Sequence, residues 1–162
     1  MFKELYLKSI KLAGHKSSKF FLGFFSFIES FIFPIPPDVI IIPMTIAKKQ
    51  EWIKIALIAT VGSILGACFG YFIGYVFFNE IGIKIFEFYG VEPSFWKSKV
   101  SSEGGIIAWT TLLAIAGFSP IPFKLLTISS GFIHFNLAYF VIVSFLTRGL
   151  RFFLIAFLIG NF

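Results

Sequence analysis

A run of 24 residues without a charge, from position 55 to position 78, most constrains how this chain can fold. At about 1.5 Å of rise per residue, a helix of this length spans the roughly 30 Å hydrocarbon core of a bilayer. Hydrophobic residues make up 57% of all 162 residues, Phe alone contributes 25, and the mean hydropathy is +0.91. A water-soluble domain of this size could not hide so much apolar surface. The sequence therefore predicts an all-α integral membrane protein.

The number and sign of the charged residues indicate which partners this chain can bind. Charged residues make up only 14% of the chain, too few for a disordered protein, a coiled coil or a conventional nucleic-acid binder. The 14 Lys and Arg residues outnumber the 8 Asp and Glu residues. In a membrane protein such an excess marks segments that face the cytoplasm and anionic lipid. We therefore expect membrane lipid as a partner and no nucleic acid.

Cysteine and histidine give no indication of a cofactor or of catalysis. The single cysteine, Cys68, can form no internal disulfide. His15 and His134 are far apart and have no neighbouring ligand pair, so we expect no metal and no other cofactor. Serine, cysteine and histidine form no evident nucleophile arrangement, so we expect no catalytic residue and no enzyme.

The N-terminal segment, residues 1–19, combines five lysines with apolar residues at helical spacing. This pattern is typical of a basic amphipathic helix at the membrane interface, and a disordered basic tail is the alternative. Both interpretations place the N-terminus in the cytoplasm, where lysine-rich segments are retained. No cleavable signal peptide is expected. Residues 20–162 then form a single membrane domain.

Prolines break the first apolar stretch, residues 20–47, at its centre. Pro34, Pro36 and Pro37 remove backbone donors and block helix continuation. Each remaining arm is too short to cross a bilayer, so we predict a re-entrant hairpin whose break lines a cavity. A hairpin also returns the lysines that follow position 47 to the cytoplasm.

The rest of the chain repeats this order. After the predicted transmembrane helix 55–78, residues 79–104 carry charges of both signs and are expected to lie outside as two short amphipathic helices. Residues 106–133 form a second apolar stretch, broken by Pro120 and Pro122, and predict a second re-entrant hairpin. Residues 136–162 form the last transmembrane helix.

Two Pro-Ile-Pro units, at positions 34–36 and 120–122, suggest an internal repeat. Each is followed two positions later by a charged residue, Asp38 in one case and Lys124 in the other. Since one span separates the two hairpins, the halves would enter from opposite sides, as in inverted-repeat transporters whose broken helices form the substrate site. Coincidence of two tripeptides in an Ile-rich chain is the alternative.

Two arginines interrupt the last predicted span. Arg148 and Arg151 lie three residues apart and therefore on one helix face. Charges at such depth usually face a polar cavity and meet an anion, and the donor fork of arginine suits phosphate. The alternative is that the apolar arm ends before Arg148, which would place both arginines at the cytoplasmic boundary.

Glu29 and Asp38 are the only carboxylates in the first predicted hairpin. Burial at low dielectric favours the protonated form, which makes them candidates for proton coupling or gating, whereas pairing with Arg148, Arg151 or Lys124 keeps them ionised. Structural ion pairing is an equally open interpretation. Two acidic groups against three basic groups leave one positive charge, which a phosphate headgroup would compensate.

A stripe of small residues marks the uncharged run. Gly66, Gly70 and Gly74 recur every four residues, next to Tyr71. Such a stripe permits close helix approach, so we expect it to pack against a hairpin or, in a homo-oligomer, against a second protomer.

Four motifs in this order resemble the DedA family, also described as the VTT-domain or SNARE-associated Golgi protein-like family, in its YqaA-like branch. They are Glu29 with Pro34-Ile35-Pro36-Pro37-Asp38, Gly66-xxx-Gly70-Tyr71-xx-Gly74, Phe118-Ser119-Pro120-Ile121-Pro122-Phe123-Lys124 and Arg148-Gly149-Leu150-Arg151-Phe152. The resemblance covers about residues 20–155. It implies an inner-membrane protein with two opposed re-entrant hairpins, in a family linked to moving polyprenyl phosphate or phospholipid across the bilayer with dependence on the proton motive force.

The resemblance also implies residue roles. Glu29 and Asp38 would take the acidic, proton-coupling roles, and the basic residues of the second hairpin would bind phosphate. Better-studied members carry two arginines around the second proline motif, and Gly117 stands near one of these positions. We therefore expect Arg148 and Arg151 to supply that charge. The expected function is a transporter or scramblase for a phosphate-bearing lipid. A structural or assembly protein of envelope maintenance, and an intramembrane lipid-phosphate enzyme, are the alternatives.

Overall fold

The computed structural model describes residues 17–31, 36–88, 94, 98, 101–119 and 123–161. Within these residues the chain is helical and contains no strand, which confirms the all-α prediction. The elements are α2 (Ser18–Glu29), α3 (Asp38–Ala47), the 3₁₀ turn η1 (Lys49–Glu51), α4 (Trp52–Phe77), the π-helical turn η2 (Phe78–Gly82), α5 (Ile83–Phe88), α7 (Glu103–Phe118), α8 (Phe123–Phe132) and α9 (Leu137–Asn161).

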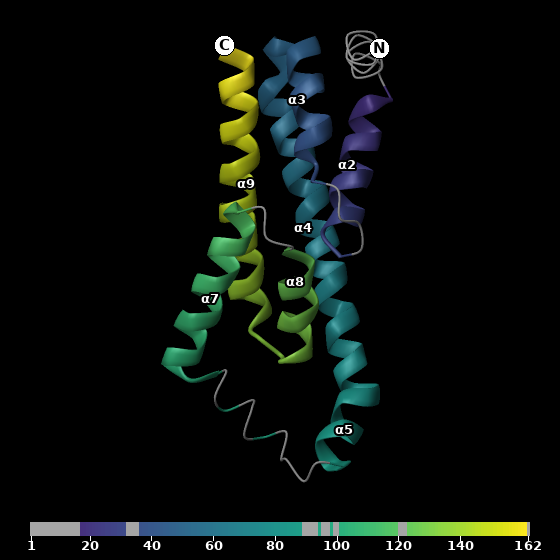
Figure 1. Ribbon diagram of the computed structural model, residues 1–162, viewed down its shortest axis with the longest axis vertical. Helices are drawn as coiled ribbons and strands as arrows, with labels where there is room; N and C mark the ends of the chain where they lie inside the picture. Colours follow the sequence, from purple (N-terminus) through teal and green to yellow (C-terminus); the bar gives the residue numbers. More distant parts are fainter. Residues whose placement is uncertain are drawn as a thin grey trace.

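Two helical hairpins enter the molecule from opposite ends (Figure 1). Helices α2 and α3 occupy the end at which α9 terminates, whereas α7 and α8 occupy the end at which α9 begins. The long helices α4 and α9 run past both hairpins. As a result, the last turns of α2 and α7 come to lie near the middle of the molecule.

Each hairpin shares its arms between the two long helices. The first arms pack on the long helix that follows them, α2 on α4 and α7 on α9. The second arms cross over, so that α3 packs on α9 and α8 packs on α4. The two halves of the chain are therefore interlocked, and neither hairpin rests on one long helix alone.

Prolines precede the second arm of the first hairpin. Pro37 is the N-cap of α3, and its carbonyl accepts hydrogen bonds from the backbone amides of Ile40 and Ile41, each at 2.9 Å. Proline suits a helix start because its fixed φ is close to the helical value and its missing N–H is not needed there. Pro36 lies directly before it.

Some of the predicted features lie outside the described residues. They are positions 1–16 of the predicted interfacial segment, and Pro34, Pro120 and Pro122 of the two predicted breaks. On either side of positions 120–122, α7 ends at Phe118 and α8 begins at Phe123.

Glycines bring α4 close to both hairpins. A Cβ atom on Gly66 would lie 2.0 Å from the carbonyl oxygen of Phe27 in α2, and one on Gly74 would lie 1.9 Å from that of Ile128 in α8. Gly70 faces Thr127 of α8, whose Oγ1 would be 2.8 Å from such an atom. No larger side chain fits at these distances, so the small-residue stripe lies against hairpins of the same chain.

Tyr71, in the same stripe, ties α4 to the segment between α8 and α9. Its hydroxyl donates a hydrogen bond to the carbonyl oxygen of Phe135 at 2.5 Å, and its ring lies 5.3 Å from that of Phe140. Tyr71 thus stabilises the turn from which α9 starts.

The segment predicted as external, residues 79–104, differs from the expectation at its beginning. The helix predicted over 55–78 starts at Trp52 and continues through η2 into α5 to Phe88, so no separate surface helix starts at 79. The ring of Phe78 lies 5.1 Å from Phe132 and 4.7 Å from His134, and these contacts hold the extension against the end of α8. At the other boundary, α7 begins at Glu103.

Two segments of the described chain, Lys49–Glu80 and Leu137–Asn161, are long and apolar enough to cross a membrane by length and composition. Large apolar side chains are exposed along both, among them Leu65 and Phe72 on α4 and Leu146 and Leu158 on α9. The helices are thus apolar on their outer faces as well as in the core.

Candidate functional site

The middle of α9 carries two arginines on one face. Arg148 is 4% exposed, and the helix continues through Arg151 to Asn161. The helix therefore does not end before Arg148, and this side chain lies inside the bundle rather than on its surface. An arginine so deeply buried requires a partner for its charge, since leaving it uncompensated is costly.

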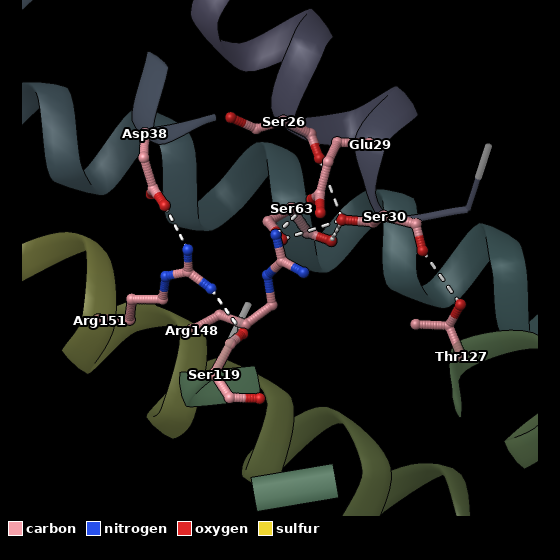
Figure 2. Close-up of polar contacts among 9 residues, drawn as sticks. All are labelled: Ser26, Glu29, Ser30, Asp38, Ser63, Ser119, Thr127, Arg148 and Arg151. Atoms are coloured by element: carbon pink, nitrogen blue, oxygen red, sulfur yellow. Dashed lines mark hydrogen bonds and ion pairs between the residues drawn. The ribbon is translucent and has the colours of Figure 1, made fainter. Parts of the chain in front are cut away.

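Glu29, the last residue of α2, is that partner. Nη2 of Arg148 donates to Oε2 of Glu29, and both side chains are mostly buried (Figure 2). The guanidinium also lies 4.8 Å from the ring centroid of Phe123, the first residue of α8, and 5.3 Å from that of Phe152. Both contacts lie within the range of cation–π attraction. Arg148 therefore contacts both hairpins.

Arg151 joins the two hairpins more directly. Its Nη2 donates to Oδ2 of Asp38, the first residue of α3, and its Nη1 donates to the backbone carbonyl of Ser119 at 2.8 Å (Figure 2). Ser119 is the C-cap of α7 and has extended backbone angles. One guanidinium thus connects the start of one arm with the end of an arm from the other half of the chain.

Buried hydroxyl groups surround the ion pairs. Ser30 Oγ donates to the carbonyl of Ser63 in α4 at 2.9 Å and lies 3.0 Å from the Ser63 hydroxyl. Thr127 of α8 donates to the carbonyl of Ser30 at 3.0 Å, so α2, α4 and α8 meet at this residue (Figure 2). No sequence motif predicted a role for these residues. The one signal in the sequence is that Ser26 and Ser30 lie four residues apart, on either side of Glu29, at the end of a largely apolar helix.

Several buried polar atoms of the site have no hydrogen-bond partner among the described residues. They are Nε of Arg148, Oδ1 of Asp38, and the hydroxyl oxygens of Ser26 and Ser144. Ser144 lies one helical turn before Arg148 on α9. The site therefore contains a donor on the guanidinium and an acceptor on the carboxylate that the two ion pairs do not use.

Lys124, the third predicted phosphate ligand, lies in the first turn of α8, directly after Phe123. It is partly buried, and its carbonyl accepts a hydrogen bond from Thr127 at 2.8 Å. The structure thus gathers Glu29, Asp38, Arg148 and Arg151 into one cluster. Lys124 directly follows Phe123, the residue whose ring contacts Arg148.

The chemistry available to this cluster is anion binding and proton exchange. Two guanidinium groups offer bidentate donors, and two carboxylates can exchange a proton. No group of three or more His, Cys, Asp and Glu residues that could hold a metal ion occurs in the described part of the chain.

Comparison with known proteins shows clear relatives. An uncharacterized protein of Haemophilus influenzae is 35% identical over 158 residues, covering 96% of this chain and 79% of the relative. The HI0703 homolog of Histophilus somni is 39% identical over 157 residues, with the same coverage of each chain. This chain belongs to the HI0703 family. A further relative, MJ0201 of Methanocaldococcus jannaschii, is 26% identical over 151 residues, covering 93% of this chain and 87% of that protein.

Relatives of the HI0703 family therefore match nearly the whole chain, including the segments that carry Glu29, Asp38, Arg148 and Arg151. No protein-family model matches the chain. No solved structure matches it either.

Proposed function

We propose that the chain is a multi-pass inner-membrane protein of DedA type that translocates a phosphate-bearing lipid, either a polyprenyl phosphate or a phospholipid. It acts as a transporter or scramblase, coupled to protons through Glu29 and Asp38, and its N-terminus faces the cytoplasm. The observation that carries the proposal is the placement of the buried Arg148 and the mostly buried Arg151 where the two hairpins meet.

The outer surface supports the membrane location. Helices α4 and α9 are long enough to span, and they expose large apolar side chains that water would not favour. The charged cluster lies inside the bundle, which is where ionisable groups of membrane proteins usually face.

The packing of the arms supports an inverted repeat. In each half the first arm packs on its own long helix and the second arm on the long helix of the other half. The entry of the hairpins from opposite ends (Figure 1) also favours two halves of opposite direction. Inverted repeats of this kind place the substrate site where their broken helices meet.

The geometry of Arg148 supports phosphate binding. One guanidinium nitrogen contacts Glu29, and Nε–H has no partner among the described residues. A phosphate oxygen can take that donor, and protonation of Glu29 or Asp38 weakens the competing ion pair. Lys124, which follows the Arg148 contact Phe123 in the sequence, is proposed as a third positive charge for the headgroup.

Gly117 supports the assignment of this role to α9. A Cβ atom there would lie 2.2 Å from Thr147 Oγ1 and 3.7 Å from Arg148 Cγ. A long side chain at position 117 would therefore collide with α9. Better-studied DedA members carry an arginine near position 117. In this chain the buried guanidinium next to that position comes instead from Arg148 on α9.

Headgroup accessibility in proteoliposomes tests the proposal. Fluorescent phospholipid or short polyprenyl phosphate is placed in both leaflets, and an impermeant quencher is added outside, with and without a proton gradient. We expect wild type to quench beyond the one-leaflet limit. The Arg148→Ala/Arg151→Ala variant should stop at that limit while remaining folded and inserted. Quenching limited to one leaflet for wild type with every lipid and gradient would contradict translocation.

A structural or assembly function is the second candidate, because both arginines already have carboxylate partners. Reversing the signs within a pair separates the two candidates. The Glu29→Arg/Arg148→Glu variant keeps the ion pair but moves the guanidinium to α2. A purely structural pair predicts that the reversed variant keeps its cellular function, whereas a phosphate site predicts that it loses translocation.

A further inference from the structure

An apolar groove lies on the outside of the molecule, between α2 and α4 and apart from the arginine cluster. It has a volume of about 680 Å³, within the roughly 300–1,000 Å³ of small-ligand sites. Its two walls approach each other closely at Gly23 and Gly62, since a Cβ on Gly62 would be 2.4 Å from the carbonyl oxygen of Gly23. Exposed apolar side chains, Phe24 and Leu57 among them, form the walls.

Lysines gather at one end of this groove. Lys19 lines it, and its ammonium lies 2.6 Å from Oε2 of Glu51. Lys48 and Lys54 lie three residues before and three residues after Glu51 in the sequence, so positive charges outnumber the negative one here. This end of the groove therefore has a net positive charge, while the rest of its lining is apolar.

The groove extends along α4 from this positive end. Leu57, Val61 and Leu65 lie on one face of α4, and Lys54 occupies the position one turn before Leu57. From Lys54 to Leu65 the helix rises about 16 Å, which is close to half of the roughly 30 Å hydrocarbon core. A positive end followed by an apolar channel of one leaflet's depth matches a lipid with an anionic headgroup and an acyl chain.

A second groove on α4 has the opposite charge. It has a volume of about 390 Å³ and is lined by Phe72, Phe77 and other apolar residues together with Glu80. Both grooves offer apolar walls on the same helix, but this one has a carboxylate where the first has an ammonium group. It provides an internal control for the effect of charge.

We propose that the groove between α2 and α4 binds an anionic phospholipid, with the headgroup phosphate between Lys19 and Lys54 and one acyl chain along the groove. This site is separate from Arg148 and Arg151. The inference rests on the membrane location proposed above, but it does not depend on translocation.

Photocrosslinking in nanodiscs tests the site with the full chain. Phe24, 49% exposed in the groove, is replaced by p-benzoylphenylalanine, and Phe72, 60% exposed in the second groove, is replaced in a matched variant. The discs contain equal amounts of phosphatidylglycerol and phosphatidylcholine. Mass spectrometry of the adducts gives the ratio of the two lipids at each position.

We expect phosphatidylglycerol to exceed phosphatidylcholine about fivefold or more at position 24, and not at position 72. Lys19→Gln/Lys54→Gln should abolish the preference. Lys19→Arg/Lys54→Arg should retain it, which separates the loss of charge from a loss of folding, and helical content and monodispersity are checked for each variant.

Three results would overturn the site. They are equal labelling by both lipids at position 24, a preference that survives the double glutamine change, and an adduct with the mass of two chains, which would assign the groove to a second copy. Absence of any lipid adduct at both positions would overturn the membrane location itself, and with it this inference.

Discussion

Arg148, in the middle of α9, is paired with Glu29, the last residue of α2, which lies 119 positions earlier in the chain. The pair is largely shielded from solvent, and Phe123 and Phe152 flank the guanidinium. Because the helix that carries Arg148 belongs to the second half of the chain, the pair joins the two halves at their centre.

Removing one charge of this pair should be much more costly than removing both. Glu29→Gln leaves Arg148 without its partner carboxylate, and we expect a loss of about 3–5 kcal/mol in the free energy of unfolding. Glu29→Gln/Arg148→Gln should recover a large part of it. Denaturant unfolding in micelles, followed by circular dichroism, measures both.

The Lys19–Glu51 pair provides the control for that prediction. Both side chains are about one-third exposed, so solvent screens their interaction. Glu51→Gln should therefore change stability far less than Glu29→Gln. Equal effects of the two changes would mean that water reaches Glu29 and Arg148 as well.

Arg151 should control the opening of the end of α7. It holds the Ser119 carbonyl and Asp38 at once, which the compact ammonium of lysine cannot reproduce with the same geometry. We expect Arg151→Lys to speed hydrogen exchange of the Ser119 amide, which donates to Ile115, by about fivefold, the effect of losing roughly one hydrogen bond.

Hydrogen-exchange mass spectrometry of peptides that span residues 115–119 measures this exchange rate. Peptides within α2 serve as the reference, since Arg151 makes its described contacts with Asp38 and Ser119 rather than with that helix. Unchanged exchange at Ser119 would show that Arg151 does not hold this end of α7.

Adding a methyl group to the small-residue stripe should separate α4 from the hairpins. Gly66→Ala and Gly74→Ala each place a Cβ about 2 Å from a backbone oxygen of the facing helix, which can give way only by moving. We expect each to cost about 1–3 kcal/mol. Gly104→Ala is the matched control, because no described atom lies within 4 Å of the added methyl group. In thermal unfolding in micelles, Gly66→Ala and Gly74→Ala should both unfold at a lower temperature than Gly104→Ala.

Tyr71→Phe should weaken the turn before α9. The change removes the hydrogen bond to the Phe135 carbonyl but keeps the ring contact with Phe140, so the expected cost is about 0.5–1.5 kcal/mol. Tyr139→Phe, at a side chain that is 50% exposed, should be nearly neutral. Equal unfolding midpoints for the two variants would show that the hydrogen bond of the Tyr71 hydroxyl contributes nothing.

Features that depend on neighbours along the chain could be predicted from the sequence. Apolar runs of sufficient length predict helices, and α3 begins directly after Pro37 because the fixed φ of proline suits the start of a helix. The shared face of Arg148 and Arg151 follows from helical periodicity. The extension of α4 into α5 was missed, because the aromatic contacts of Phe78 that support it come from α8 and the turn after it.

The partners within the cluster depend on tertiary packing. The sequence left open which carboxylate meets which base. The crossing of α3 onto α9 brings Asp38 to Arg151, and the packing of both α2 and α9 on α4 brings Glu29 to Arg148. The hydroxyl contacts of Ser30 also depend on tertiary packing. The sequence around a serine is the same whether its hydroxyl bonds to its own helix or to another helix. Local spacing determines which side of a helix a residue occupies, whereas the position of neighbouring helices determines what that residue contacts.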